Sequence, residues 1–332
     1  KYYQIMMPCE KACLFFVKVG DKFYYDESNG IMCSRSKIHR VEVPAVELDK
    51  SKEYTVFIRP IIIRKAYFSK TKNVLEKTYK FYPVPENNIR AYHIADAHNN
   101  IEEPIKAAET FGDIDFLILN GDVIEDSSNP KNFMNIYEIC SRLTKGERPV
   151  IFSRGNHDLR GNFAEKFADY TPTHKGNTYY NFRIGSIWGI LLDCGEDKED
   201  NHREYSGLND FTSLRLEQVE FLKKELASKE FKKANKRILF HHIPIYGMLR
   251  GNLCEPLWRP MLDKAPFDVA FNAHVHKYAY HPAGSSQNNY PVIIGGGNSM
   301  KSATVMVLEK RNDKLYVKVL NTSGEVLLEW ED

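Results

Sequence analysis

The sequence has no hydrophobic run near the ~18–20 residues that a membrane-spanning helix requires. Its longest apolar runs, such as residues 187–192, have only the length of a strand. It also lacks an excess of either charge, because 46 lysines and arginines stand against 44 aspartates and glutamates, a formal net charge of +2. So small a net charge favours neither nucleic acid nor an anionic membrane surface as a partner. We therefore expect no nucleic-acid partner and no membrane span, and leave protein partners open.

Cysteine is scarce and dispersed. None of the six cysteines forms a C-x-x-C pair, so the sequence indicates neither a zinc framework nor a disulfide scaffold. A chain of 332 residues can bury a core without disulfides or metals, so a metal site is expected to serve function rather than folding. The sequence starts at Lys1 rather than methionine, which leaves a cytoplasmic protein and a secreted one without its signal peptide as the expected alternatives. Buried or unreactive thiols are expected at Cys9, Cys13, Cys33, Cys140, Cys194 and Cys254.

Residues 1–85 and 86–332 show different patterns, which predicts two domains. The first part alternates short β-type runs with turn signals and has no helical period, so we expect a small all-β, fibronectin III-like sandwich domain. Pro83 and Pro85 restrict the backbone between the two parts and predict a stiff linker. The expected strands of the first domain are residues 12–19, 22–25, 54–63 and 74–81.

Beyond residue 86, predicted strands alternate with predicted helices, which is typical of an α/β domain whose helices cover a parallel sheet. The expected helices are residues 101–111, 132–143 and 214–226. The expected strands are residues 89–94, 115–119, 149–153, 178–184, 187–193, 237–240, 268–271, 304–308, 314–320 and 326–330.

Metal-binding residue types follow five of these strands. Parallel strands bring their carboxyl ends to one edge of a sheet, where α/β proteins bind ligands. A single Asp-x-His or Gly-Asp fragment is more typical of an ordinary turn or helix cap, but five such fragments in order favour a metal site. Oxygen and imidazole donors suit manganese, iron, zinc or magnesium. The fragments hold Asp96 and His98, Asp122, Asn156 and His157, His241 and His242, and His274 and His276.

In these fragments the sequence resembles the calcineurin-like metallophosphoesterases, over roughly residues 88–300. The β-sandwich in front and the His242-x-Pro244-x-Tyr246 segment are most similar to the purple acid phosphatase-like branch. The resemblance implies a four-layer α/β/β/α metallophosphoesterase sandwich behind the N-terminal domain. The motifs that carry it are Asp96-Ala97-His98, Gly121-Asp122, Gly155-Asn156-His157-Asp158, His242-Ile243-Pro244 and Ala273-His274-Val275-His276.

The resemblance also implies a hydrolase of phosphoric esters with two divalent or trivalent metal ions, of which iron, manganese or zinc are favoured. Asp122 would bridge the ions, with Asp96, His98 and His276 on one and Asn156, His242 and His274 on the other. His242 is preferred to His241 because the family histidine precedes a proline by two residues. Two close cations lower the pKa of a shared water, so that hydroxide is the expected nucleophile. His157 is the expected proton donor or transition-state stabiliser.

One position departs from the purple acid phosphatases. The tyrosine that binds ferric iron there, three residues after the bridging aspartate, is Glu125 in this sequence, so we expect no purple colour. Glu125 is a candidate for orienting His157. His202 and Arg250 are candidates for contacting a phosphorylated small-molecule substrate. A phosphodiesterase rather than a phosphomonoesterase, or a binding protein that kept the fold without turnover, are the alternative functions.

Overall fold

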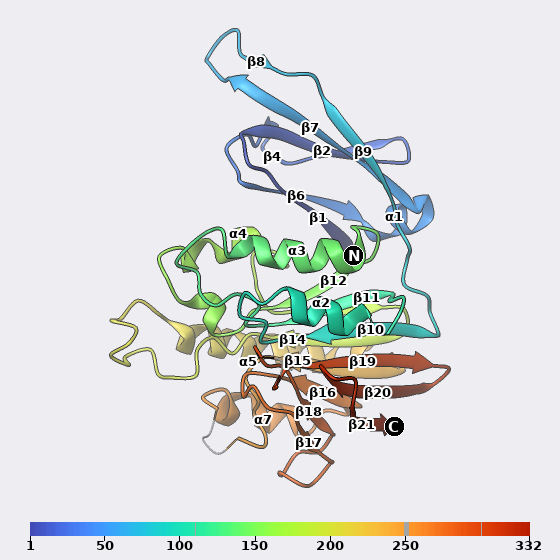
Figure 1. The fold of residues 1–332 in the computed structure, drawn as a ribbon. Coiled ribbons are helices and arrows are strands. Elements are labelled where there is room, and N and C mark those ends of the chain that lie inside the picture. The colour runs from blue at the N-terminus through green and yellow to red at the C-terminus, as the bar shows by residue number, and fades with distance from the viewer. Residues whose placement is uncertain (110, 249–251, 300) are drawn as a thin grey trace. The chain divides into compact units, whose positions relative to one another are not determined.

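The computed structural model describes residues 1–109, 111–248, 252–299 and 301–332 (Figure 1). The chain divides into two compact units. The first comprises Lys1–Pro83 with Thr144–Pro149, and the second Val84–Leu143 with Val150–Asp332. In the described part of the chain, no helix is both long and apolar enough to cross a membrane.

The first unit is built on β-strands that enclose a hydrophobic core. Strand β2 alternates buried and half-buried residues, and its buried Phe15 and Val17 pack with Val41 and Val43 of β6. This confirms the predicted all-β region in front of the phosphoesterase-like part, and adds strands β1 and β6 and helix α1 (Ala45–Ser51), which the sequence did not indicate. Its strands are β1 (Tyr2–Pro8), β2 (Cys13–Val19), β3 (Lys22–Tyr25), β4 (Glu27–Ser28), β5 (Ile31–Met32), β6 (Ile38–Pro44), β7 (Glu53–Ile63), β8 (Lys70–Thr71) and β9 (Leu75–Lys80).

These strands form two main sheets. Strands β1 and β6 pair antiparallel, and the larger sheet runs in the order β3-β2-β7-β8, with β9 also paired to β7. Strands β4 and β5 form a short hairpin. The short helix α1 follows Pro44 and ends at Ser51, and the backbone of the next residue, Lys52, is left-handed with φ 57°.

The second unit contains two six-stranded sheets. The first has the order β12-β11-β10-β19-β20-β21, in which β10, β11 and β12 are parallel. Its strands are β10 (Ile89–Ile94), β11 (Phe116–Asn120), β12 (Val150–Ser153), β19 (Thr304–Arg311), β20 (Lys314–Asn321) and β21 (Val326–Glu331). The second has the order β13-β14-β15-β16-β18-β17, in which β14, β15, β16 and β18 are parallel. Its strands are β13 (Tyr180–Ile184), β14 (Ile187–Leu192), β15 (Lys236–His241), β16 (Val269–Asn272), β17 (Ala279–His281) and β18 (Val292–Ile294).

Three hydrophobic clusters arrange the second unit in four layers. Residues such as Ala91, Phe240 and Phe271 join the two sheets face to face. Helices α2 (Glu102–Glu109) and α3 (Phe133–Thr144) pack on the outer face of the first sheet. Helices α5 (Phe211–Ala227) and α7 (Glu255–Leu262) pack on that of the second (Figure 1). Because both faces of β14 are covered, all of its residues are buried. The predicted α/β/β/α sandwich is therefore confirmed.

The five strands that precede the predicted site lie in two sheets rather than in one. Strands β10, β11 and β12 belong to the first sheet, and β15 and β16 to the second. The pattern of strands and helices alone indicated one parallel sheet, whereas the α/β/β/α sandwich implied by the resemblance has two. Side-chain periodicity shows that a segment is a strand but not which sheet it joins. The remaining helical segments are η1 (His157–Leu159), η2 (Ala164–Lys166), α4 (Phe167–Tyr170) and α6 (Lys229–Lys233).

Candidate metal centre

Side chains that follow strands of both sheets meet in one place. His242, after β15, has its Nε2 atom 3.0 Å from Asp122 Oδ2, after β11. His276, after β16, has its Nε2 atom 3.5 Å from Asp96 Oδ1, after β10. His98 Nε2 lies 3.8 Å from Asp122 Oδ2. The two sheets thus bring together residues up to 180 positions apart in the sequence.

The donor atoms form two groups that share Asp122. In each group, all ligand atoms lie within 4.8 Å of one another. The amide oxygen of Asn156 lies 2.9 Å from His274 Nδ1 and so adjoins the second group. The first group is Asp96, His98, Asp122 and His276, and the second is Asp122, His242 and His274.

The backbone at these residues is unusual. Five of them have positive φ, a conformation that costs free energy for residues other than glycine and is concentrated at functional sites. They are Asp96 at 53°, His98 at 46°, Asp122 at 50°, His274 at 71° and His276 at 51°. The surrounding fold holds the side chains in place at the expense of local backbone strain.

Two glycines permit the close approach of the loops. A Cβ atom on Gly155 would lie 2.1 Å from Asp122 Oδ1, and one on Gly296 would lie 2.1 Å from Asp96 Oδ2. Real Cβ atoms do not approach so closely, so any larger residue at either position would displace the carboxylate. Both aspartate carboxylates therefore occupy space that a side chain at Gly155 or Gly296 would fill.

Two histidines of the centre each use Nδ1 for a hydrogen bond, which leaves Nε2 as an acceptor directed into the centre. His242 Nδ1 lies 2.7 Å from the Asn120 carbonyl oxygen, and donation there leaves the Nε2 lone pair directed at Asp122 Oδ2. These two buried atoms have no hydrogen-bond partner within the described ranges. His98 Nδ1 lies 3.0 Å from Glu125 Oε2, and donation there leaves His98 Nε2 as the acceptor in its 2.9 Å contact with His276 Nε2. Opposed acceptors of this kind fit bound cations.

Without a cation, protons on the histidines balance part of the negative charge of the buried aspartates. Burial disfavours the charge of His242, but Asp122 and Asp96 outweigh it and raise the pKa of His242 to about 10. The pKa of Asp122 is lowered in spite of its burial, because His242, His157 and His98 surround it. Burial lowers the pKa of His274 to about 4, and the nearby His242 adds to this effect. The imidazole of His274 is consequently neutral at physiological pH and free to act as a ligand.

Asp158 supports the centre without joining either donor group. Its carboxylate, fully buried, accepts hydrogen bonds from the backbone N–H groups of Gly155 at 2.7 Å and Asp122 at 3.0 Å. Burial and the Asp122 charge raise the pKa of Asp158, against the effect of the backbone N–H donors of Gly155 and Ile124. In the sequence Asp158 was named only as the last residue of the Gly155-Asn156-His157-Asp158 motif, without a role of its own.

His157 lies at the rim of the centre, with 27% of its side chain exposed. Its Nδ1 lies 2.9 Å from the backbone carbonyl oxygen of Glu125, whereas the Glu125 carboxylate is 3.8 Å away and contacts His98 more closely. It is thus the backbone of Glu125 that orients His157, and the carboxylate that orients His98. Side-chain periodicity could not show which part of Glu125 would be used.

Arg160 contacts the other side of the His157 ring, with Nη1 3.2 Å from Nε2. The same guanidinium forms two hydrogen bonds with the buried carboxylate of Glu196, at 2.6 and 2.8 Å. The next residue, Asp197, places Oδ2 3.9 Å from His274 Nε2. The sequence did not single out Glu196 or Asp197, because they lie in a polar loop with no motif.

Two other candidates among the described residues have different partners. His202 accepts a hydrogen bond from the Glu204 N–H and packs near Tyr205, both in its own loop. His241 is buried beside Asn272, so the structure brings His242 rather than His241 into the centre. Arg250 lies outside the described residues.

This fold and donor set define a metallophosphoesterase-type protein. The family model for the calcineurin-like phosphoesterases matches residues 89–278, more than half of the chain, and the chain belongs to this family. The predicted membership of the calcineurin-like metallophosphoesterases is therefore confirmed. The family implies divalent metal ions as cofactors.

Two curated relatives share 25% identity over 158 residues: the serine/threonine-protein phosphatase CPPED1 of Homo sapiens and that of Pongo abelii. The match covers 44% of this chain and 46% of each relative, so the chain spans about half the length of the curated relatives it matches.

Solved structures show the same fold. Purple acid phosphatase PPD1 from yellow lupin has a TM-score of 0.64 at 14% identity, covering 99% of this chain and 71% of that one. A dimetal phosphatase from Danio rerio has a TM-score of 0.53 at 12% identity, covering 75% and 99%. GAP50 of Plasmodium, described as an anchor in the inner membrane complex, has a TM-score of 0.53 at 16% identity, covering 74% and 88%.

Proposed function

We propose that this protein hydrolyses phosphoric esters of small molecules at a dinuclear metal centre. The observation that carries the proposal is the pair of donor groups that share the buried carboxylate of Asp122. A shared acidic ligand is needed to hold two cations close together, since their charges repel. The family match and the phosphatase relatives support phosphoester hydrolysis.

The residues divide between the two ions as the sequence resemblance implies. Asp122 would contribute to both, and Asn156 adds an oxygen donor without adding negative charge. When bound, the ions supply positive charge that stabilises phosphoryl oxygens and acidifies water at the site. One ion would be held by Asp96, His98, Asp122 and His276, and the other by Asp122, Asn156, His242 and His274.

His157 is positioned to protonate the leaving oxygen. Its Nδ1 is held by the Glu125 carbonyl, so a proton can be exchanged with the substrate only at Nε2. Because Nε2 accepts a hydrogen bond from Arg160 Nη1 in this structure, the Arg160 contact must open when the imidazole carries the proton. Arg160 remains bound to Glu196 through Nε and Nη2 while this happens.

Two substitutions test the proposal. Asp122→Asn is expected to remove the bridging charge, lower the bound metal and reduce hydrolysis of an aryl phosphate to background. His157→Ala should keep the metal but reduce kcat by about 10²–10⁴-fold, the usual contribution of a general acid. Metal content and turnover are measured on the same preparations, with the exposed Asp169→Asn as control.

Normal turnover by Asp122→Asn contradicts the proposal. So does a metal-loaded wild-type protein that hydrolyses neither aryl monophosphates nor bis-aryl phosphates, since it would act as a binding protein. A preference between the two substrate types assigns the enzyme as a phosphomonoesterase or a phosphodiesterase.

A further inference from the structure

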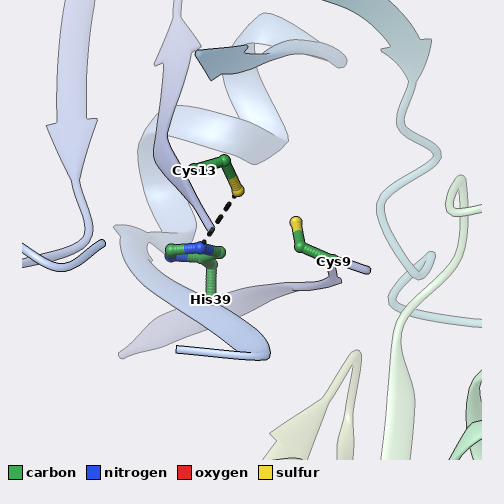
Figure 2. A group of neighbouring side chains, drawn as sticks. All are labelled: Cys9, Cys13 and His39. Atoms are coloured by element: carbon green, nitrogen blue, oxygen red, sulfur yellow. Dashed lines mark hydrogen bonds between the residues drawn. The ribbon is translucent and has the colours of Figure 1, made fainter. Parts of the chain in front are cut away.

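A second group of metal-binding residue types lies in the first unit. It consists of Cys9, directly after β1, Cys13 at the start of β2, and His39 in β6 (Figure 2). The two Sγ atoms and one ring nitrogen of His39 lie within 4.8 Å of one another. Cys13 and His39 are 2% and 0% exposed, and Cys9 is half-buried. Thiol and imidazole groups therefore converge at a largely buried point with one partly open side.

Backbone pairing fixes this convergence. Met7 and His39 are partners in the β1–β6 ladder, which ends at the pair of Pro8 with Ile38. The Cys9 N–H then donates to the Lys37 carbonyl oxygen at 2.8 Å, so Cys9 stays beside the start of β6. Cys13 occupies a buried position of β2, on the same face of the strand as the core residues Phe15 and Val17. The three side chains are thus held by strands rather than by a loose loop.

The hydrogen bonds of His39 direct one ring nitrogen at the thiols. Its Nδ1 is bonded to the Asp26 carboxylate, and its Nε2 lies 3.3 Å from Cys13 Sγ. A carboxylate on the far nitrogen is the arrangement that fixes the tautomer and orientation of metal-binding histidines in proteins. The hydrogen bond to Asp26 therefore orients His39 as a metal ligand would be oriented.

We propose that Cys9, Cys13 and His39 bind one zinc ion in the first unit, separate from the phosphoesterase centre. Two thiolates and an imidazole nitrogen suit zinc, which is four-coordinate in such sites, and water occupies the fourth position. Binding displaces the thiol protons to solvent, so that two S–H bonds break and two S–Zn bonds form. The half-buried Cys9 provides the entry side for the ion.

A disulfide is the other role that two neighbouring cysteines suggest. Both are free thiols, so no disulfide joins them in the structure. A disulfide would also not need the imidazole of His39, whose Nε2 lies 3.3 Å from Cys13 Sγ.

Cobalt(II) provides a spectroscopic test on the full, reduced chain. Cobalt at this site is expected to give intense thiolate-to-metal charge-transfer absorption that saturates at one ion per chain. Cobalt at the phosphoesterase centre gives none, because that donor set contains only oxygen and nitrogen atoms. The Asp122→Asn protein should therefore keep the absorption, so that failure of this proposal and failure of the proposed function are distinguishable.

The matched variants are Cys9→Ser with Cys13→Ser, which should lose the absorption and one bound zinc per chain, and Cys33→Ser, which should change neither. Asp26→Asn should keep the absorption but weaken zinc affinity about 10–100-fold, a change that a merely structural carboxylate would not cause. Circular dichroism checks that each variant is folded. If the double variant is not folded, the change in zinc affinity of Asp26→Asn decides between a zinc site and a structural cluster.

Three results would overturn the proposal. The first is no charge-transfer absorption in reduced wild-type protein. The second is the same absorption in the double serine variant, or its loss in Cys33→Ser. The third is a purified chain whose intact mass shows a disulfide between Cys9 and Cys13 and which, after reduction, retains no zinc.

Discussion

At the scale of single residues, the candidate centre depends on side chains that do not belong to its donor groups. Asp158 accepts hydrogen bonds from the backbone of Asp122 and of Gly155, and so joins the turns after β11 and β12. Glu125 contacts His98 with its carboxylate and His157 with its carbonyl. Residues that contact the metal-binding side chains, rather than the metal itself, thus control the geometry of the ligands.

Replacing Asp158 by alanine is expected to destabilise the protein and its centre together. The buried backbone N–H groups of Asp122, Ile124 and Gly155 would lose their acceptor, which should lower the free energy of unfolding by about 3 kcal/mol. Activity should fall as well, since Asp122 would be displaced. Chemical denaturation and turnover measure the two effects. An Asp158→Ala protein as stable and active as Asp126→Asn, in which only an exposed turn bond is altered, contradicts this role.

Replacing Glu125 by alanine separates two roles for this residue. If its carboxylate orients His98, the affinity for metal should fall about 10–100-fold and excess metal should restore turnover. If Glu125 instead acted in the chemical step, excess metal would leave turnover low. The measurement is activity against metal concentration, with the exposed Glu138→Ala as control.

At the scale of elements, the site depends on short turns at strand ends rather than on helices. The turn between β12 and η1 carries Gly155 and Asn156 and leads directly into His157, and it passes so close to Asp122 that no side chain fits at Gly155. Helix α7 was not predicted, because its sequence contains two prolines. Pro256 lies in the first turn, where proline is tolerated, whereas Pro260 lies inside the helix.

The variant Gly155→Ala tests the tightness of this turn. The new Cβ would displace Asp122, and a shift near 1 Å at a catalytic centre can reduce kcat by about 10²-fold. Gly176→Ala is the control, because its φ of +86° strains an alanine by about 1–2 kcal/mol but nothing lies within 4 Å of the new Cβ. Equal turnover of the two variants would show that steric contact with Asp122 is unimportant.

At the scale of the whole molecule, the two units have separate hydrophobic cores and separate candidate metal sites. The core of the first unit gathers around Phe15 and Val17. Two of its proposed zinc donors, Cys13 and His39, lie in β-strands of that unit, and Cys9 directly follows one. The phosphoesterase donors all come from the second unit. We propose that the predicted division near residue 85 separates two domains that fold independently.

A chain that begins at Val84 is therefore expected to fold and to hydrolyse an aryl phosphate at a rate per bound metal similar to that of the full chain. Far-ultraviolet circular dichroism and turnover test this, and the full chain with Asp122→Asn gives the background. A truncated chain that is folded and metal-loaded but inactive would show that the first unit contributes to catalysis.

Much of the second unit was predictable because its signals are local. Hydrophobic periodicity located β10, β11 and β15 to within one or two residues, and turn residues marked their ends. Strands β1 and β6 were missed, since they alternate less regularly and carry polar residues such as His39. The use of the Glu125 carbonyl to orient His157 was equally inaccessible, because both residues lie in turns without a period.

The sequence by itself determined which residue types follow each strand, and hence the family and its donor atoms, since those features depend on neighbours along the chain. Only the tertiary structure decided that β10 and β16 lie in different sheets and yet place Asp96 beside His276. It alone brought Cys9, Cys13 and His39 together. Such contacts depend on how strands pair and sheets pack over long sequence separations, which no local pattern encodes.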